Sequence, residues 1–151
     1  MLYLAAMVVH GDTYETSTIA NLMHLMLAAL TVFAAWVAGR EWSPEAGVVA
    51  ALSTASMGWL VYLSGLAYVE CGLLFFGTAG VACLARAVGG SELEKNTQPR
   101  RSSARWLIPA GLFGGLACGC KYTAAVFVAL PLLAAALAIG SATWSQRLRN
   151  Y

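Results

Sequence analysis

Two charged side chains, Glu70 and Lys121, lie inside segments of this chain that are otherwise apolar. Lys121 belongs to a glycine-laced stretch, residues 111–131. A lysine near the centre of a bilayer costs about 2.5–3.5 kcal/mol on insertion scales, so such residues are rare and usually face a polar cavity or a partner. Glu70 and Lys121 therefore indicate either a polar cavity or a structural ion pair inside the bundle.

The composition around these two residues is that of a membrane protein. Of the 151 residues, 60% are hydrophobic and only 11% are charged, with a mean hydropathy of +0.69. Soluble domains have about 25% charged residues. Several apolar segments reach or approach the ~20 residues that a helix needs to cross a bilayer. We therefore predict an all-α fold, a polytopic transmembrane helix bundle, that forms a single domain over residues 1–151.

Turn and capping residues divide the bundle into an N-terminal stub and about five full or near-full spans. The stub covers residues 2–9, and residues 10–17 are expected to form a polar loop. Residues 43–45 have the capping serine, first-turn proline and first-turn acid that are typical of a helix start. The glycines at 89–90 are expected to end the third span, and Pro131 to kink the last one. The expected spans cover residues 18–39, 43–63, 66–87, 106–118 and 122–140.

The placement of the cations predicts the orientation of these spans. Residues 91–105 form the one strongly hydrophilic stretch, and we expect them to be a cytoplasmic connector. This arrangement places the C-terminus and eight of the nine cations in the cytoplasm, as the positive-inside rule favours. The ninth cation is Lys121. The 10–17 loop, Glu70 and Lys121 then lie toward the outer or lumenal side, which makes that side the predicted location of a site.

The histidines and cysteines do not suggest a metal site. His10 and His24 have no partners at metal-ligand spacing, and we interpret both as interfacial or packing residues. Asp12 and Glu15 are interpreted as solvated loop acids. The four cysteines lie in apolar segments without C-x-x-C spacing and are interpreted as small packing residues, namely Cys71, Cys83, Cys118 and Cys120.

The remaining patterns indicate packing and topology. Gly111, Gly115 and Gly119 recur every fourth residue, which predicts a small-residue face for close helix contact. Arg100 and Arg101 are interpreted as topology determinants or contacts for anionic lipid, and not as a nucleic-acid site. The sequence has no phosphate-binding glycine loop, no H-E-x-x-H and no G-x-S-x-G motif.

Three stretches of the chain resemble one family. Residues 115–124 read GLACGCKYTA and resemble the G-L-A-x-G-x-K-[YW]-[TS] stretch of GT-C-type membrane glycosyltransferases, which include the dolichyl-phosphate-mannose–protein mannosyltransferases. Residues 62–76 resemble that family's tight turn followed by Y-[VA]-[DE] and L-x-F-F. Residues 30–44 resemble its apolar helix, [GA]-R and S-P loop. The matches come in family order, and the resemblance covers roughly residues 1–140.

The resemblance implies a membrane enzyme that transfers a sugar, such as mannose, from a lipid-phosphate donor of the polyprenyl phosphate type on the outer or lumenal face. In that family, an acid in the first external loop is the catalytic base, often near a divalent metal. The stub at 2–9 resembles the end of the family's second span, which implies an N-terminal-half fragment that lacks this loop. Such a fragment is expected to be inactive alone and to hold no cofactor itself, with a divalent metal in the full-length enzyme. The acceptor is not identified.

The same resemblance assigns the substrate-binding residues. Glu70 matches a second acidic position, where relatives organise the donor or acceptor pocket. Most relatives have Asp there, so the role of Glu70, including a catalytic one, is left open. Lys121 matches the family lysine and is expected to bind the lipid phosphate. Tyr122 and Tyr68 are expected to line the same cavity, although Tyr68 also fits an interfacial aromatic belt.

Two other kinds of function are compatible with the sequence. In a transporter or channel fragment, Glu70 and Lys121 would serve ion or substrate passage, and inverted repeats with interrupted helices would favour this hypothesis. In a non-catalytic membrane scaffold subunit, the 151-residue chain would be stable and complete.

Overall fold

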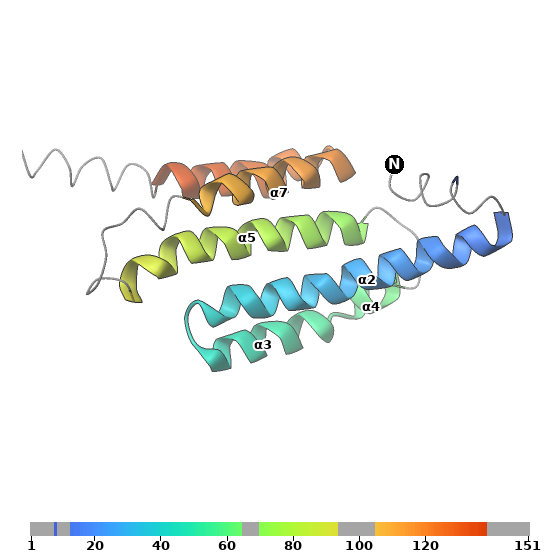
Figure 1. Ribbon diagram of the computed structural model, residues 1–151, viewed down its shortest axis with the longest axis horizontal. Helices are drawn as coiled ribbons and strands as arrows, with labels where there is room; N and C mark the ends of the chain where they lie inside the picture. The colour runs from blue at the N-terminus through green and yellow to red at the C-terminus, as the bar shows by residue number, and fades with distance from the viewer. Residues whose placement is uncertain (1–7, 9–12, 65–69, 94–104, 139–151) are drawn as a thin grey trace, which may run out of the picture.

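The computed structural model describes residue 8 and residues 13–64, 70–93 and 105–138. Within these ranges the chain is helical and contains no strand, which confirms the all-α expectation. In chain order (Figure 1), the elements are α2 Thr13–Arg40, α3 Pro44–Ala55, α4 Gly58–Ser64, α5 Glu70–Leu93, α7 Leu107–Cys120 and a π-helix, η2, Ala125–Ala129, which begins a helix that runs to Ala138.

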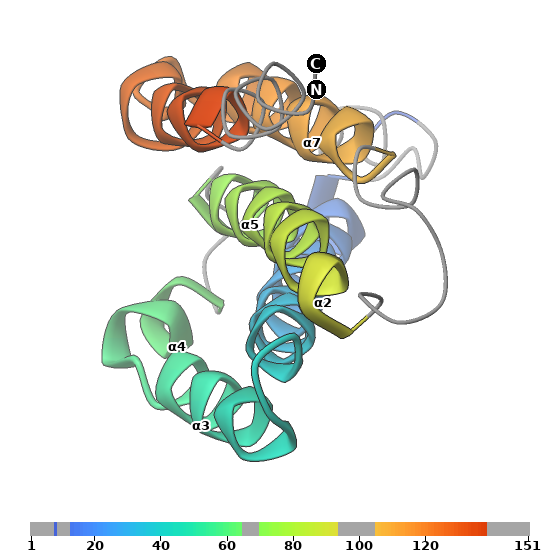
Figure 2. The ribbon, with the colours of Figure 1, turned by 90° about the vertical axis from the view of Figure 1, so that its left-hand side faces the viewer.

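The helices pack in layers with α5 in the middle. One side of α5 packs on α2 and the other on α7, while α3 packs on another face of α2 (Figures 1 and 2). The helix that begins at Ala125 folds back along α7. A core cluster joins α2, α4 and α5, and its buried members are Ala28, Leu60, Leu63 and Cys71.

The full or near-full spans expected from the sequence differ in length in the described part of the chain. Within the described residues, two helical segments are long and apolar enough to cross a membrane, Thr18–Arg40 of α2 and Glu70–Ala87 of α5. A third is obtained if α3 and α4 count as one broken span. The helices Leu107–Cys120 and Ala125–Ala138 are apolar but shorter than the ~20 residues of a full span. The five expected spans therefore correspond to two or three full spans and two short helices.

Two helix ends differ from the sequence expectation. The polar loop expected at 10–17 is wrong from Thr13 onward, because α2 already begins there. No glycine or proline lies between Gly11 and Gly39, and extending an existing helix is far easier than starting one. The glycines at 89–90 also do not end α5, which continues to Leu93. Each glycine costs only about 1 kcal/mol in a helix interior, too little to terminate a long packed helix.

The segment expected to be one span, residues 43–63, consists of two helices. Its start is as predicted, since Ser43 caps α3 by accepting a hydrogen bond from the Ala46 amide at 3.0 Å, and proline occupies the first turn. The chain then bends by 61° between α3 and α4. This is one interrupted helix pair in the described part of the chain, whereas an inverted-repeat transporter requires a second at the corresponding position.

The glycines that make close contacts are not those of the expected stripe. A Cβ at Gly111, Gly115 or Gly119 would meet no described atom within 4 Å, so the predicted packing role of this stripe has no described partner. The buried face of α7 is instead Ala110, Gly114 and Ala117. A Cβ at Gly114 would lie 3.4 Å from Leu132. The contact face of α7 therefore lies one residue before the glycine repeat, a rotation of about 100° around the helix axis.

The backbone upstream of Pro131 has a π-helical turn. The Leu130 amide donates to the Ala125 carbonyl, five residues back, where an α-helix would use the residue four back. Proline cannot donate a hydrogen bond and crowds the preceding turn, and π-turns are one way in which helices absorb such a disruption. The irregularity expected near this proline is therefore taken up over Ala125–Ala129.

Candidate functional site

The two charges of the otherwise apolar segments form an ion pair. Lys121 Nζ donates a hydrogen bond to Glu70 Oε1 at 3.0 Å. Glu70 is the first residue of α5, and Lys121 follows the last residue of α7 with an extended backbone, φ −153° and ψ 131°. Because α5 and α7 run antiparallel, the start of one lies beside the end of the other (Figure 1). Residues 51 positions apart in the sequence are thus brought together.

The helix ends favour both charges. The amide groups at the N-terminus of a helix carry partial positive charge, which stabilises the Glu70 carboxylate at the start of α5. The carbonyl groups at the C-terminus carry partial negative charge, which stabilises the Lys121 ammonium after α7. The Lys121 amide also donates to the Ala117 carbonyl at 3.2 Å, which holds the backbone at this position. The pair is therefore supported by its secondary structure as well as by mutual attraction.

The pair is only partly covered. The side chain of Glu70 is 27% exposed and that of Lys121 is 40% exposed, so a ligand can reach both. The second carboxylate oxygen of Glu70, Oε2, is buried and has no hydrogen-bond partner among the described residues. Lysine has three N–H donors, of which one is used by Glu70. The site therefore offers a ligand the unused N–H donors of Lys121, while Glu70 Oε2 is covered.

Small and aromatic residues hold α5 against α7 next to the pair. A Cβ at Gly72 would lie 3.2 Å from the Cys120 sulfur, so the absence of a side chain allows this close approach. Phe75 and Phe76, from the L-x-F-F part of the family-like stretch, each place their ring centroid 6.3 Å from that of Phe113 on α7. The motif residues thus build the interface that positions Glu70 and Lys121.

His24, which the sequence interpretation assigned to packing or the interface, lies on α2 and is fully buried. α2 packs on α5, the helix that begins with Glu70.

The other predicted site residues lie outside the pair. Tyr122 follows Lys121, and the residue is 85% exposed. Tyr68 and Asp12 lie outside the described residues, and Glu15 belongs to α2. No group of three or more His, Cys, Asp or Glu side chains in residues 13–64, 70–93 and 105–138 could hold a metal ion.

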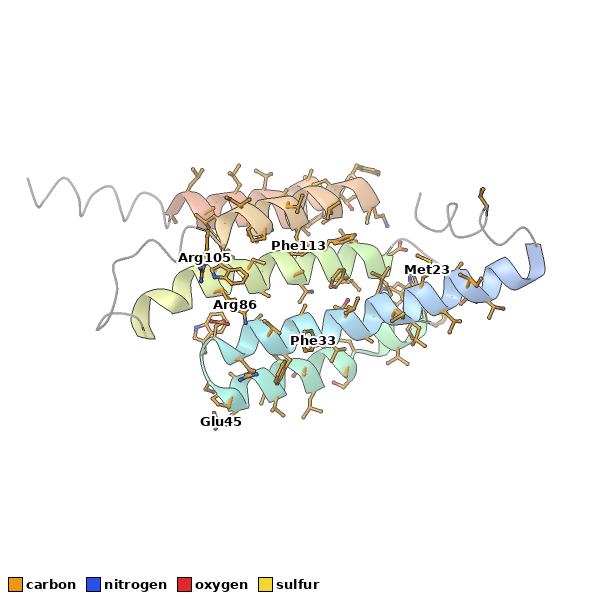
Figure 3. All side chains as sticks on the ribbon, in the orientation of Figure 1. Met23, Phe33, Glu45, Arg86, Arg105 and Phe113 are labelled. Atoms are coloured by element: carbon orange, nitrogen blue, oxygen red, sulfur yellow. The ribbon has the colours of Figure 1, made fainter. Side chains whose placement is uncertain are left out.

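A second ion pair lies at the opposite end of α5. Arg86 Nε donates to Glu41 Oε1 at 2.9 Å, and the Arg86 guanidinium lies 4.9 Å from the ring centroid of Trp106. Arg40 similarly covers Trp36 at 4.5 Å. Arg86 and Arg105 lie at this end of the bundle, and Met23, next to His24, lies toward the other (Figure 3). The described arginines therefore gather away from Lys121, as the predicted orientation requires.

Comparison with known proteins identifies one family. The family model described as dolichyl-phosphate-mannose-protein mannosyltransferase matches residues 9–150. This match includes every residue of the three stretches that carry the resemblance in the sequence. No curated protein and no solved structure matches the chain.

Proposed function

The chain belongs to the dolichyl-phosphate-mannose-protein mannosyltransferase family, and we propose that it is part of a GT-C-type enzyme that binds a sugar linked to a polyprenyl phosphate. The family and the apolar helices make it an integral membrane protein with a glycosyltransferase-like role. The proposal adds the lipid-phosphate donor, the outer or lumenal face and the residues that bind the donor.

The Glu70–Lys121 pair is the observation that carries this proposal. In sugar transfer, the bond between the sugar C1 and the phosphate oxygen breaks, and a bond from C1 to the acceptor oxygen forms. The departing lipid phosphate gains negative charge, which the ammonium of Lys121 stabilises through its remaining N–H donors. Glu70 Oε1 accepts the hydrogen bond of Lys121 and so holds the ammonium in place. The proton of the acceptor goes to a base that the proposal assigns to no residue of this chain.

The proposal routes no step through a metal ion. The resemblance associates a divalent metal with the catalytic loop, but the described residues offer no cluster of ligands that fits one. Glu70 is already engaged by Lys121, whose positive charge disfavours a cation at the same carboxylate. Phosphate recognition at this site is therefore attributed to Lys121.

A double variant separates this function from a purely structural ion pair. We expect Lys121→Met to weaken binding of polyprenyl phosphate to the purified protein in nanodiscs. Glu70→Gln should strengthen it up to about fivefold, because a partly exposed pair is worth up to about 1 kcal/mol and its carboxylate competes with the phosphate. The Glu70→Gln/Lys121→Met double variant should bind as weakly as Lys121→Met. If the pair is only structural, removing both charges leaves neither unpaired, and the double variant should bind like the wild type.

The orientation of the site is tested by cysteine labelling. Tyr122 and Trp42 are 85% and 72% exposed and flank the two ends of the bundle, beside Lys121 and Glu41. In a background with Cys118 and Cys120 replaced by Ala, a membrane-impermeant maleimide should label Tyr122→Cys in intact cells. Trp42→Cys should be labelled only after permeabilisation. The reverse pattern would place the site on the cytoplasmic face and contradict the proposed donor side.

A further inference from the structure

Arg40 is a cation that the proposed reaction does not use. It is the last residue of α2 and precedes Glu41, whose ion pair with Arg86 lies toward the end of α5 opposite the candidate site. The acid nearest to Arg40 in the chain is therefore already engaged, and the next one, Glu45, is exposed in the first turn of α3. Within the described part of the chain, the Arg40 guanidinium donates no hydrogen bond and forms no ion pair.

The side chain of Arg40 is nevertheless held in place by packing. Its guanidinium carbon lies 4.5 Å from the ring centroid of Trp36, one turn earlier on α2. A Cβ at the buried Gly47 of α3 would lie only 2.5 Å from Arg40 Cγ, so the absence of a side chain at Gly47 makes room for the stem of the arginine. The stem thus packs against α3 while the charged group rests on a ring of α2.

The stacking on Trp36 leaves the edge of the guanidinium available. An arginine has five N–H donors that lie in the plane of its guanidinium, and a contact with a ring uses the face of that plane. Pairs of these donors match two oxygens of a phosphate group in a parallel, bidentate arrangement. Arg40 therefore presents an unused anion-binding edge at a defined place on the bundle.

The surroundings of Arg40 fit an anion that carries an acyl chain. Phe33, Trp36 and Arg40 are spaced by three and four residues and share one side of α2. The ring centroids of Phe33 and Trp36 lie 5.5 Å apart, and Phe33 is 57% exposed. Trp42, two residues after Arg40, is 72% exposed, as is typical of a tryptophan at the level of the lipid headgroups. An aromatic strip thus leads from the apolar part of α2 to a cation at headgroup level.

We infer that Arg40 binds the phosphate of an acidic phospholipid, whose acyl chain lies along Trp36 and Phe33. An acidic lipid is preferred over a zwitterionic one, because the headgroup of the latter carries its own cation and gains less from Arg40. The partial negative charge at the end of α2 also favours a cation there, but it requires neither the ring of Trp36 nor the space at Gly47. The inference is independent of the proposed sugar donor and of Lys121.

Competition between two lipids tests this site in the full chain. The purified protein in detergent is mixed with equal amounts of phosphatidylglycerol and phosphatidylcholine that have the same acyl chains, and native mass spectrometry gives the ratio of the two bound lipids. One arginine near the surface favours an acidic lipid about fivefold. The wild type should therefore prefer phosphatidylglycerol by about this factor, and Arg40→Gln should lose the preference. Equal ratios for the two proteins would overturn the inference.

Two further variants separate a specific site from net charge. Arg105 is exposed, lies at the same end of the bundle (Figure 3), and stacks on no described ring, so Arg105→Gln is matched to Arg40→Gln in charge and should keep the preference. Trp36→Leu preserves every charge but removes the ring beneath the guanidinium, and should lower the preference at least about twofold. An equal loss in Arg105→Gln, or an unchanged ratio in Trp36→Leu, would refute the site at Arg40.

Arg40→Lys covers the case in which Arg40→Gln does not fold. It keeps a cation at the end of α2 but loses the flat fork of donors, so the preference for phosphatidylglycerol should fall here as well. An unchanged ratio in folded Arg40→Lys would contradict the role of the guanidinium. Lys121→Met should retain the preference even if it loses polyprenyl phosphate. A loss of the preference in Lys121→Met would place the bound lipid at the other end of the bundle and overturn the inference, without affecting the proposed function.

Discussion

Replacing Lys121 with methionine is expected to weaken polyprenyl-phosphate binding about ten- to hundredfold. Hydrogen bonds to charged groups are worth about 1.5–3 kcal/mol, and 1.4 kcal/mol corresponds to a factor of ten in affinity. Methionine keeps the unbranched apolar stem of lysine and removes the charge and its three donors. Titration of polyprenyl phosphate into nanodiscs that contain the purified protein, followed by tryptophan fluorescence or calorimetry, measures the effect.

Arg86 provides a closely matched control for this variant. Its ion pair with Glu41 has an N–O distance of 2.9 Å and its side chain is 42% exposed, compared with 3.0 Å and 40% for Lys121. Both pairs join α5 to another part of the bundle, but at opposite ends. Arg86→Met should therefore leave polyprenyl-phosphate binding unchanged. Equal losses in both variants would indicate a general charge effect and would contradict the assignment of the site to Lys121.

Loss of binding in Lys121→Met must also be distinguished from misfolding. The substitution leaves the Glu70 carboxylate without its cation, and removing one partner of a covered pair is more disruptive than removing both. The Glu70→Gln/Lys121→Met variant removes this problem, since neither charge remains. Size-exclusion profiles of both variants in the same detergent show whether the bundle is intact. If the double variant is monodisperse and still binds weakly, the loss of affinity is due to the missing Lys121 ammonium and not to misfolding.

The ion pair could be predicted because it depends on rare residues in a simple context. Charges inside apolar segments are unusual, so the positions of Glu70 and Lys121 in the sequence identify them as candidate site residues. The resemblance of the surrounding stretches to one family then predicts that both belong to one pocket. Helix starts with strong local signals were also predictable, as at Ser43. These features depend on a few neighbouring residues, which the sequence displays directly.

The full burial of His24 and the contact face of α7 depend on tertiary packing. The sequence does not show that α2 lies against α5, so the burial of His24 could not be derived from it. Likewise α7 contains several glycines, and the successive residues Gly114 and Gly115 point in different directions although both fit a small-residue contact. Successive helix residues differ by about 100° around the axis, so an error of one residue selects the wrong face. Choosing between them requires the position of Leu132, which packs on the Gly114 side.

Gly39→Ala is expected to destabilise the bundle by about 1–3 kcal/mol, the usual range for overpacking a well-packed interior. A Cβ at Gly39 would lie 2.6 Å from the Ala46 carbonyl oxygen and 2.8 Å from the Gly47 Cα. Both atoms belong to the backbone of α3, so no side-chain rotation relieves the clash and α2 and α3 must separate. Thermal unfolding in one detergent, followed by tryptophan fluorescence or loss of the monodisperse peak, should show a lower midpoint than for the wild type.

Gly115→Ala is the matched control, because a Cβ there meets no described atom within 4 Å. Alanine is favoured over glycine by up to about 1 kcal/mol in a helix interior, so this variant should be as stable as the wild type or more stable. Gly39 lies two residues before Glu41, whose ion pair with Arg86 is toward the end of α5 opposite Glu70. The protein that remains folded in Gly39→Ala should therefore bind polyprenyl phosphate normally. An equal stability loss in Gly115→Ala and Gly39→Ala would contradict this prediction. It would mean that close packing of α2 on α3 is not what makes Gly39 sensitive, and that the glycine face of α7 packs against a partner.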